Sequence, residues 1–170
     1  DMTTANWTLG ATMTRARTSV GADGVTNSAT RLTAGAVAAT NRITTTITAA
    51  ATSRTYSALV RRVTGTGVIR ISQDNFATNT DVTSLVPADG AYHLVPLTQS
   101  QLNAVMGFQL DTNTDAIDVD FNQFEAGAVA TSRMATTGAA RGSDLLLYTL
   151  GSWYNTLGGT LYVEFMNPSI

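Results

Sequence analysis

AIDVDFNQF, residues 116–124, is the stretch that decides the fold class of this chain. Within it Ile117, Val119 and Phe121 alternate with Asp118 and Asp120. Successive side chains of a β-strand point to opposite faces, so this period of two predicts a strand with one apolar face and one solvated acidic face. A strand of this kind needs a second layer to cover its apolar face, which favours two packed sheets.

Other β-prone stretches recur at the spacing typical of a sandwich and are separated by Gly, Asn, Asp and Pro clusters. The bias towards Thr, Ala, Gly, Val and Ser supports strands, because Thr and Val lose rotamer freedom in helices but pack well on a pleated surface. About eight strands in two antiparallel sheets predict an all-β sandwich. A short helical turn is conceivable only at 98–106. The other predicted strands are 7–17, 30–33, 42–48, 55–63, 68–72, 92–97 and 104–110.

Several local features of these strands are also predicted. Tyr56, Ala58 and Val60 should share one face of strand 55–63, and the Gly-Thr-Gly sequence at 65–67 is typical of a hairpin turn into strand 68–72. Pro96 should limit strand 92–97. Trp7, in the opening strand, is expected to belong to the core.

The chain changes character after Glu125. We predict a sandwich over 1–127, a small and polar linker over 128–143, and a C-terminal β extension over 144–170. Two strands alone are marginal in water. We therefore expect the extension to pack on a neighbouring chain or to begin a second domain.

Composition excludes several classes of protein. The chain has no cysteine, so disulfide scaffolds, thiol catalysis and cysteine-ligated zinc are excluded. Only 13% of its 170 residues are charged, the formal net charge is −2, and lysine is absent. A nucleic-acid-binding domain would show a basic stripe. No apolar run approaches the roughly 20 residues of a membrane-spanning helix. We predict no nucleic-acid partner and no membrane insertion.

Four stretches resemble a module common in phage tail-fibre and head-spike proteins. They are NWTLGATMTRARTSVGADGVTNSATRLT (6–33), ITTTITAAATSRTYSALVRRVTG (43–65), FNQFEAG (121–127) and SRMATTGAARGSDLLLYTLGSWYNTLGGTLYVEF (132–165). The resemblance implies a jelly-roll sandwich like those of carbohydrate-binding modules, located on a virion and often trimeric, with no catalysis. Its last part resembles the start of a concanavalin-like or laminin-G-like domain. Two departures are an altered Thr-Arg-x-Ala-Asp element at 139–144 and an end after one or two strands of the second domain.

Catalytic chemistry has few candidates in this sequence. His93 is the one histidine, in a predicted strand, and we interpret it as a half-exposed strand residue rather than a base. Asp118 and Asp120 would lie about 7 Å apart on one strand face, a spacing that glycoside hydrolysis permits. We interpret this pair as part of a solvated strand face and predict that the protein is not an enzyme.

Asp111-Thr112-Asn113-Thr114-Asp115 alternates like a calcium-binding loop but lacks the Gly and closing Glu of an EF-hand. Sugar-binding jelly rolls often carry a structural calcium ion, and that resemblance makes Asp111, Asp115 and Asp118 the candidate ligands. A simple polar turn is the alternative interpretation.

Sugar recognition uses aromatic faces together with convergent polar groups. Only 7% of the residues are aromatic, which is low for a dedicated sugar-binding protein. The candidate ligand-binding residues are Tyr56, Asp74, Asn75, Tyr92, Trp153 and Tyr154.

Two functional hypotheses follow. The first is a virion fibre or spike module that binds host surface polysaccharide, in contact with other virion proteins and as a homotrimer, outside the cell. The second is a purely structural spacer, capsid-attachment or trimerisation module that binds no sugar. An accessory module of a polysaccharide-degrading enzyme is a third hypothesis that fits the same fold.

Overall fold

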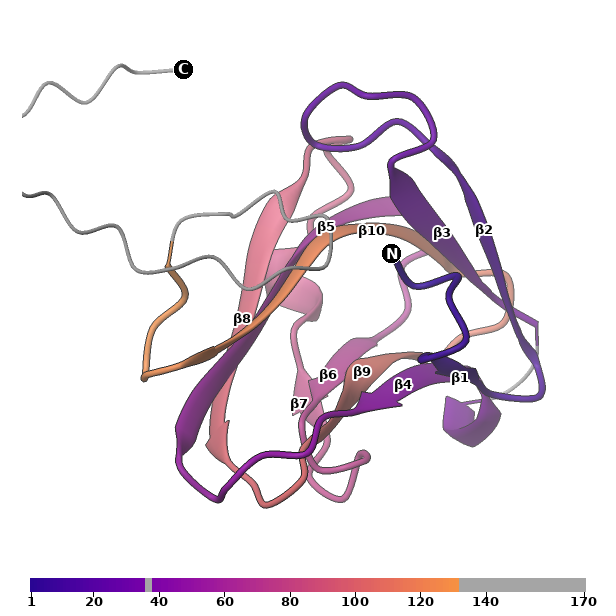
Figure 1. The fold of residues 1–170 in the computed structure, drawn as a ribbon. Coiled ribbons are helices and arrows are strands. Elements are labelled where there is room, and N and C mark those ends of the chain that lie inside the picture. The colour runs from indigo at the N-terminus through magenta and orange to yellow at the C-terminus, as the bar shows by residue number, and fades with distance from the viewer. Residues whose placement is uncertain (36–37, 132–170) are drawn as a thin grey trace, which may run out of the picture. The chain divides into compact units, whose positions relative to one another are not determined.

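Two five-stranded antiparallel sheets pack face to face in the computed structural model, which describes residues 1–35 and 38–131 (Figure 1). Two 3-10 turns, η1 (Ala38–Thr40) and η2 (Thr83–Leu85), are the helical elements of these residues. This confirms the predicted all-β sandwich. The first sheet has the order β1 (Thr8–Leu9), β4 (Arg42–Thr46), β9 (Val105–Leu110), β6 (Ile69–Ser72), β7 (Thr80–Asp81), and the second has the order β2 (Met13–Ser19), β3 (Ala29–Ala34), β10 (Ala116–Ala126), β5 (Ser53–Thr64), β8 (His93–Ser100).

The core lies between the two sheets and is built from alternate residues of their strands. In β5, Tyr56, Ala58 and Val60 are all fully buried, as the alternation predicts. The Tyr56 ring meets the Phe108 ring of the opposite sheet with centroids 5.7 Å apart. Trp7 belongs to the same core, which confirms its predicted role.

The opening stretch 7–17 does not form one strand, contrary to prediction. It divides into β1 in the first sheet and β2 in the second, with Gly10 between them. The Gly10 N–H donates to the Arg42 carbonyl at 2.7 Å, and a Cβ at this position would collide with the Thr40 carbonyl oxygen. A glycine permits this close backbone approach and so lets the chain change sheets.

The segment Gly65–Gly67 is not a hairpin turn either. It carries the chain from β5 in the second sheet to β6 in the first. The Arg62 guanidinium donates to the carbonyls of Gly65 and Gly67, and the Gly67 N–H donates to the Asp115 carboxylate at 2.8 Å. The side chains of Arg62 and Asp115 thus bind the backbone of this crossover, which connects the two sheets instead of pairing β5 with β6.

Phe121 does not face the core as predicted, because β10 is irregular at this point. The register with β5 shifts between Asp120 and Gln123, and Phe121 has a left-handed φ of 48°. The strand therefore changes face locally. Ile117 and Val119 enter the core as predicted, but Phe121 is only half-buried and lies outside the core cluster.

Pro96 does not end its strand. β8 continues to Ser100 because it is an edge strand that pairs only with β5, and an edge strand tolerates a residue without a backbone N–H. The helical turn considered for 98–106 is also wrong. Its first residues complete β8, and its last residues begin β9.

The C-terminal limit of the sandwich leads to a test. Among the residues that the structure describes, the buried core cluster runs from Met2 to Val119. The predicted linker is described only up to Thr131, and the predicted extension 144–170 lies outside the described residues. We expect a chain ending at Gly142 to stay soluble and to keep its thermal unfolding midpoint within a few degrees, measured by circular dichroism. An unfolded truncation would place the extension inside the first domain.

Candidate functional site

A pocket of about 350 Å³ lies on the outer face of the first sheet, over β4, β9 and β6. Its floor is a row of three side chains that stand directly opposite one another on these strands: Arg42, Gln109 and Arg70. The alternate residues Ile43, Phe108 and Ile71 point inward to the core, so the row must point outward. A pocket of this volume is within the range of small-ligand sites.

Asp111 fixes two members of this row. Its Oδ2 accepts a hydrogen bond from Arg70 Nε at 2.8 Å and lies 2.7 Å from the second guanidinium nitrogen. Its Oδ1 accepts from Gln109 Nε2 at 2.8 Å. The hydrogen bond to Asp111 is the main cause that raises the pKa of Arg70 above its ordinary value. Both side chains are therefore held in place before a ligand arrives.

The loop after β6 supplies one wall of the pocket. The Ser72 hydroxyl accepts the N–H groups of Asp74 at 3.0 Å and Phe76 at 2.7 Å. Asp74 in turn accepts the N–H of Thr78 at 3.0 Å. Phe76 takes a left-handed φ of 62°. This hydrogen-bonded turn places the Phe76 ring and the Asn79 amide against the pocket.

Asp74 and Asn75 were predicted to bind ligand and lie in this same loop, but neither lines the pocket. Burial alone would raise the pKa of Asp74, yet hydrogen bonds from Thr78 and Ser72 outweigh it and lower the pKa. Asp74 therefore organises the turn, and Asn75 accommodates the left-handed conformation with φ 58°. Their contribution to the site is indirect.

Arg42 differs from its neighbours in the row. Its side chain is half-buried and lines the pocket, but within the described residues it forms no ion pair and no side-chain hydrogen bond. Its backbone is fixed by the ladder with Gln109 and by the Gly10 N–H. The pocket therefore presents one guanidinium that has no ion pair among the described residues, on a strand paired to both of its neighbours.

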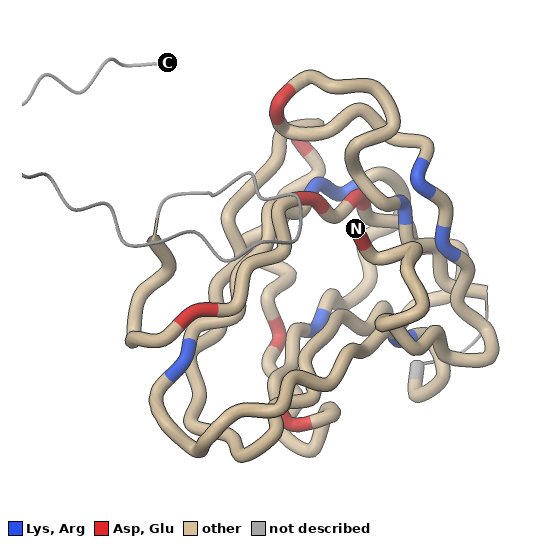
Figure 2. The backbone as a smooth tube through the Cα atoms, viewed as in Figure 1, with Lys and Arg blue, Asp and Glu red and all other residues tan. Residues whose placement is uncertain are grey.

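The second sheet carries a different charged row on its outer face. Arg31, Asp118 and Arg61 stand opposite one another on β3, β10 and β5, where basic and acidic positions adjoin in Figure 2. Asp118 is fully buried and contacts Arg31 Nε at 2.9 Å, an Arg61 guanidinium nitrogen at 2.6 Å and the Ser19 hydroxyl at 2.6 Å. Burial alone would raise its pKa, but these hydrogen bonds lower it. The predicted solvated acidic face is therefore wrong.

Asp120 is likewise buried and accepts the Ala22 N–H at 3.0 Å. The β2–β3 loop that contains Ala22 thus folds onto the acidic face of β10 and covers it. Alternation predicted which face the two aspartates share, but it could not show that a loop and two arginines cover that face.

The predicted calcium ligands do not come together. Asp111 binds Arg70, Asp118 lies between two arginines on the other sheet, and Asp115 accepts the Gly67 N–H and lies 3.8 Å from Arg62. No group of three or more acidic or histidine side chains within residues 1–35 and 38–131 is placed to hold a metal ion. Guanidinium groups already balance these carboxylates, so the prediction of calcium at these three residues is wrong.

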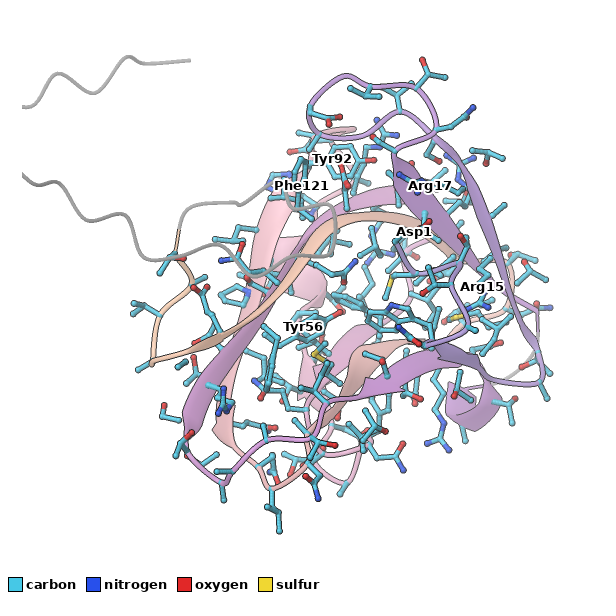
Figure 3. The ribbon with its side chains drawn as sticks, viewed as in Figure 1. Asp1, Arg15, Arg17, Tyr56, Tyr92 and Phe121 are labelled. Carbon is cyan, nitrogen blue, oxygen red and sulfur yellow. The ribbon has the colours of Figure 1, made fainter. Side chains whose placement is uncertain are left out.

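The predicted aromatic ligands are also dispersed. Tyr56 is fully buried, with its hydroxyl donating to Asn122 Oδ1 at 2.8 Å, so it has no face for a sugar ring (Figure 3). Tyr92 lies just before β8 and is half-buried, with the Arg61 guanidinium 4.6 Å from its ring centroid. Burial is the main cause that raises the pKa of Tyr92 to about 12. Trp153 and Tyr154 lie outside the described residues.

His93 is half-exposed at the start of β8, and its Nε2 lies 2.9 Å from the Asp89 carboxylate. Within the described residues, no helix has the length and apolarity needed to cross a membrane.

The pocket residues were missed by sequence reasoning. Alternation within each strand places Arg42, Gln109 and Arg70 on outward faces. The fact that their strands are neighbours depends on long-range pairing, which no local pattern encodes.

The described residues thus define a β-sandwich of the jelly-roll, carbohydrate-binding-module type, with a polar pocket on one sheet. The same fold occurs in the CBM22-1 xylan-binding domain of Paenibacillus barcinonensis Xyn10C, with a TM-score of 0.50 and 14% identity over 75% of this chain and 89% of that domain. Neither a family model nor a curated protein matches the sequence.

Two further solved structures are similar at lower scores. A tailspike protein 4 domain of bacteriophage CBA120 has a TM-score of 0.46 and 16% identity, over 72% of this chain and 19% of that one. The CBM22-1–GH10 modules of Clostridium thermocellum Xyn10B, complexed with xylohexaose, have a TM-score of 0.48 and 15% identity. The similarity covers 71% of this chain and 26% of that chain. This chain spans about a fifth of the tailspike chain and about a quarter of the xylanase chain.

Proposed function

We propose that this sandwich is a glycan-binding module and that the pocket over β4, β9 and β6 is its binding site. The observation that carries the proposal is the convergence of polar side chains from three strands and from the loops after β6 and β9, beside Phe76. Asn79, Gln109 and the two arginines offer donors to sugar hydroxyls, while Asp111 and the Asn79 amide oxygen offer acceptors. Phe76 is largely buried but lines the pocket, where it offers a small apolar surface to a sugar.

The arrangement fits weak binding that becomes useful in several copies. The pocket accommodates about one or two sugar units by volume, so a single site has limited affinity. Copies displayed together on one particle raise the effective concentration and the avidity. We propose that the module belongs to a virion fibre or spike and acts outside the cell on host surface polysaccharide. The resemblance of its sequence motifs to phage fibre modules supports this location.

The test is binding of the whole chain, in multivalent form, to an array of bacterial surface glycans. Asn79 is exposed and reaches the pocket from the loop, so we expect Asn79→Ala to weaken binding about tenfold through the loss of sugar hydrogen bonds. Gln109→Ala should weaken it at least as much, because Gln109 lies in the floor of the pocket.

Asn6→Ala is the matched control, because Asn6 is an exposed amide outside the pocket. It should bind as the wild type does. Absence of binding across the array by a folded, multivalent sample would overturn the proposal and favour a purely structural role.

A further inference from the structure

We infer that the pocket selects an acidic sugar, one that carries a carboxylate, over its neutral counterpart. This inference rests on the proposed function and specifies its ligand class. Its starting point is Arg42, a half-buried residue that lines the pocket and whose side chain has no partner within the described residues. A guanidinium in this position can take a ligand carboxylate without first giving up an ion pair.

The second sheet provides an internal comparison. There the row Arg31–Asp118–Arg61 has a carboxylate at its centre, and both guanidiniums contact it. In the pocket the central position is Gln109, which is neutral. The nearby carboxylate of Asp111 reaches Arg70 and Gln109 but forms no contact with Arg42. In the second sheet both arginines of the row contact a carboxylate, whereas in the first sheet Arg42 contacts none among the described residues.

The distribution of charge in the pocket indicates a ligand with a single negative charge at this point. Two carboxylates act on Arg70: Asp111, which pairs with it, and Asp81, which stands opposite it on β7. Arg42 is the lining cation that has no ion pair among the described residues. A sugar carboxylate carries one negative charge, and its two oxygens match the paired N–H groups of a guanidinium. A phosphate group carries more than one charge near neutral pH, which a single free arginine does not balance.

The rest of the pocket fits a sugar ring better than a small inorganic anion. Asp111 would repel a second negative charge, but its remaining lone pairs can accept sugar hydroxyls. Asn79 and the largely buried Phe76 lie on the wall formed by the loop after β6, where the Asn79 amide can bond to hydroxyls and Phe76 adds a small apolar surface. A hexuronic or sialic acid unit combines these features.

The inference is tested with pairs of oligosaccharides that differ only at the carboxyl group. The whole chain is titrated with oligogalacturonate and with its methyl ester, and with sialyllactose and its carboxyl-reduced form. We expect at least one acidic member to bind about tenfold or more tightly than its neutral partner, because one charge-assisted contact is lost in the neutral form. Raising the salt concentration should reduce this preference.

Variants assign the preference to Arg42. We expect Arg42→Gln to abolish the preference for the acidic member, and Arg42→Lys to retain part of it because the charge stays but the paired donors are lost. Arg17→Gln is the matched control, because Arg17 is an exposed arginine of the second sheet, paired with Asp1.

The outcomes separate the two claims. Equal binding of acidic and neutral members, weakened by Asn79→Ala but not by Arg42→Gln, would overturn the acidic-sugar inference and leave glycan binding in place. A preference that survives Arg42→Gln would also overturn the inference. If no acidic or neutral oligosaccharide binds a folded sample, the inference and the proposed function both fail.

Discussion

Asp118→Ala is expected to lower the free energy of unfolding by about 2–4 kcal/mol, because it leaves two guanidinium groups without their shared carboxylate. Asp118 is fully buried, and Arg31, Arg61 and Ser19 all contact it. Arg31 and Arg61 keep 38% and 25% of their side-chain exposure, so water can recover part of the loss. Urea unfolding of the wild type and the variant measures the difference.

Asp89→Asn is the matched control, since that carboxylate is 47% exposed and pairs with a half-exposed histidine. It should leave the stability essentially unchanged, because solvent screens an exposed pair. A similar small effect for Asp118→Ala would show that the arginines are satisfied without the carboxylate, and the account of this row would be wrong.

The lowered pKa of Asp118 also predicts how stability depends on acid. The folded state binds this proton more weakly than the unfolded chain, whose aspartate pKa is about 4. The stabilising contribution is therefore fully present above about pH 4 and is lost as the pH falls through the lower pKa of the folded state. In acid titrations, the wild type and Asp118→Ala should converge in stability below about pH 4. A constant difference down to pH 2 would contradict this linkage.

Tyr56→Ala is expected to destabilise the sandwich by about 3–5 kcal/mol, the usual loss for a large aromatic side chain removed from a core. Tyr56 has no exposed surface, and its ring packs against Phe108 across the two sheets. Tyr56→Phe keeps the ring and removes only the hydroxyl that donates to Asn122. It should lose about 1 kcal/mol. Equal losses in the two variants would mean that the hydroxyl rather than the ring stabilises this position.

Tyr56 also predicts behaviour in alkali. Burial raises its pKa well above the ordinary value, so the folded state retains a proton that the unfolded chain releases above about pH 10. Stability is therefore lost as the pH rises beyond about 10. Tyr92, with its pKa raised to about 12, acts in the same direction. Tyr56→Phe should flatten the alkaline decline measured by thermal unfolding, and an unchanged slope would contradict the argument.

The alternation of apolar and polar residues was enough to predict most of the strands. Strands 42–48, 55–63 and 104–110 lie close to their predicted positions, and Ile117 and Val119 are in the core. The errors fall where the backbone departs from a regular strand. Gly10 and the Gly65–Gly67 segment move the chain between sheets, and the shift within β10 turns Phe121 away from the core face.

The candidate site was predicted poorly, for a related reason. The aromatic residues chosen from the sequence include Tyr56, which is buried in the core. The pocket is instead lined by Arg42, Gln109 and Arg70. These three residues come from separate strands and meet only through the pairing of β4 and β6 with β9. No local pattern distinguishes these polar residues from other solvent-facing strand positions before the strand pairing is known.

That this chain forms strands, and which side chains of most strands face inward, follows from the amino-acid sequence, because both depend on the two-residue period and on local backbone preference. Which strands are neighbours, and therefore which charges are partners, depends on tertiary packing. Asp118 contacts two arginines, whereas Arg42 has no anionic partner among the described residues. That difference arises from contacts between residues far apart in the chain, whose geometry depends on packing and register rather than on any local pattern.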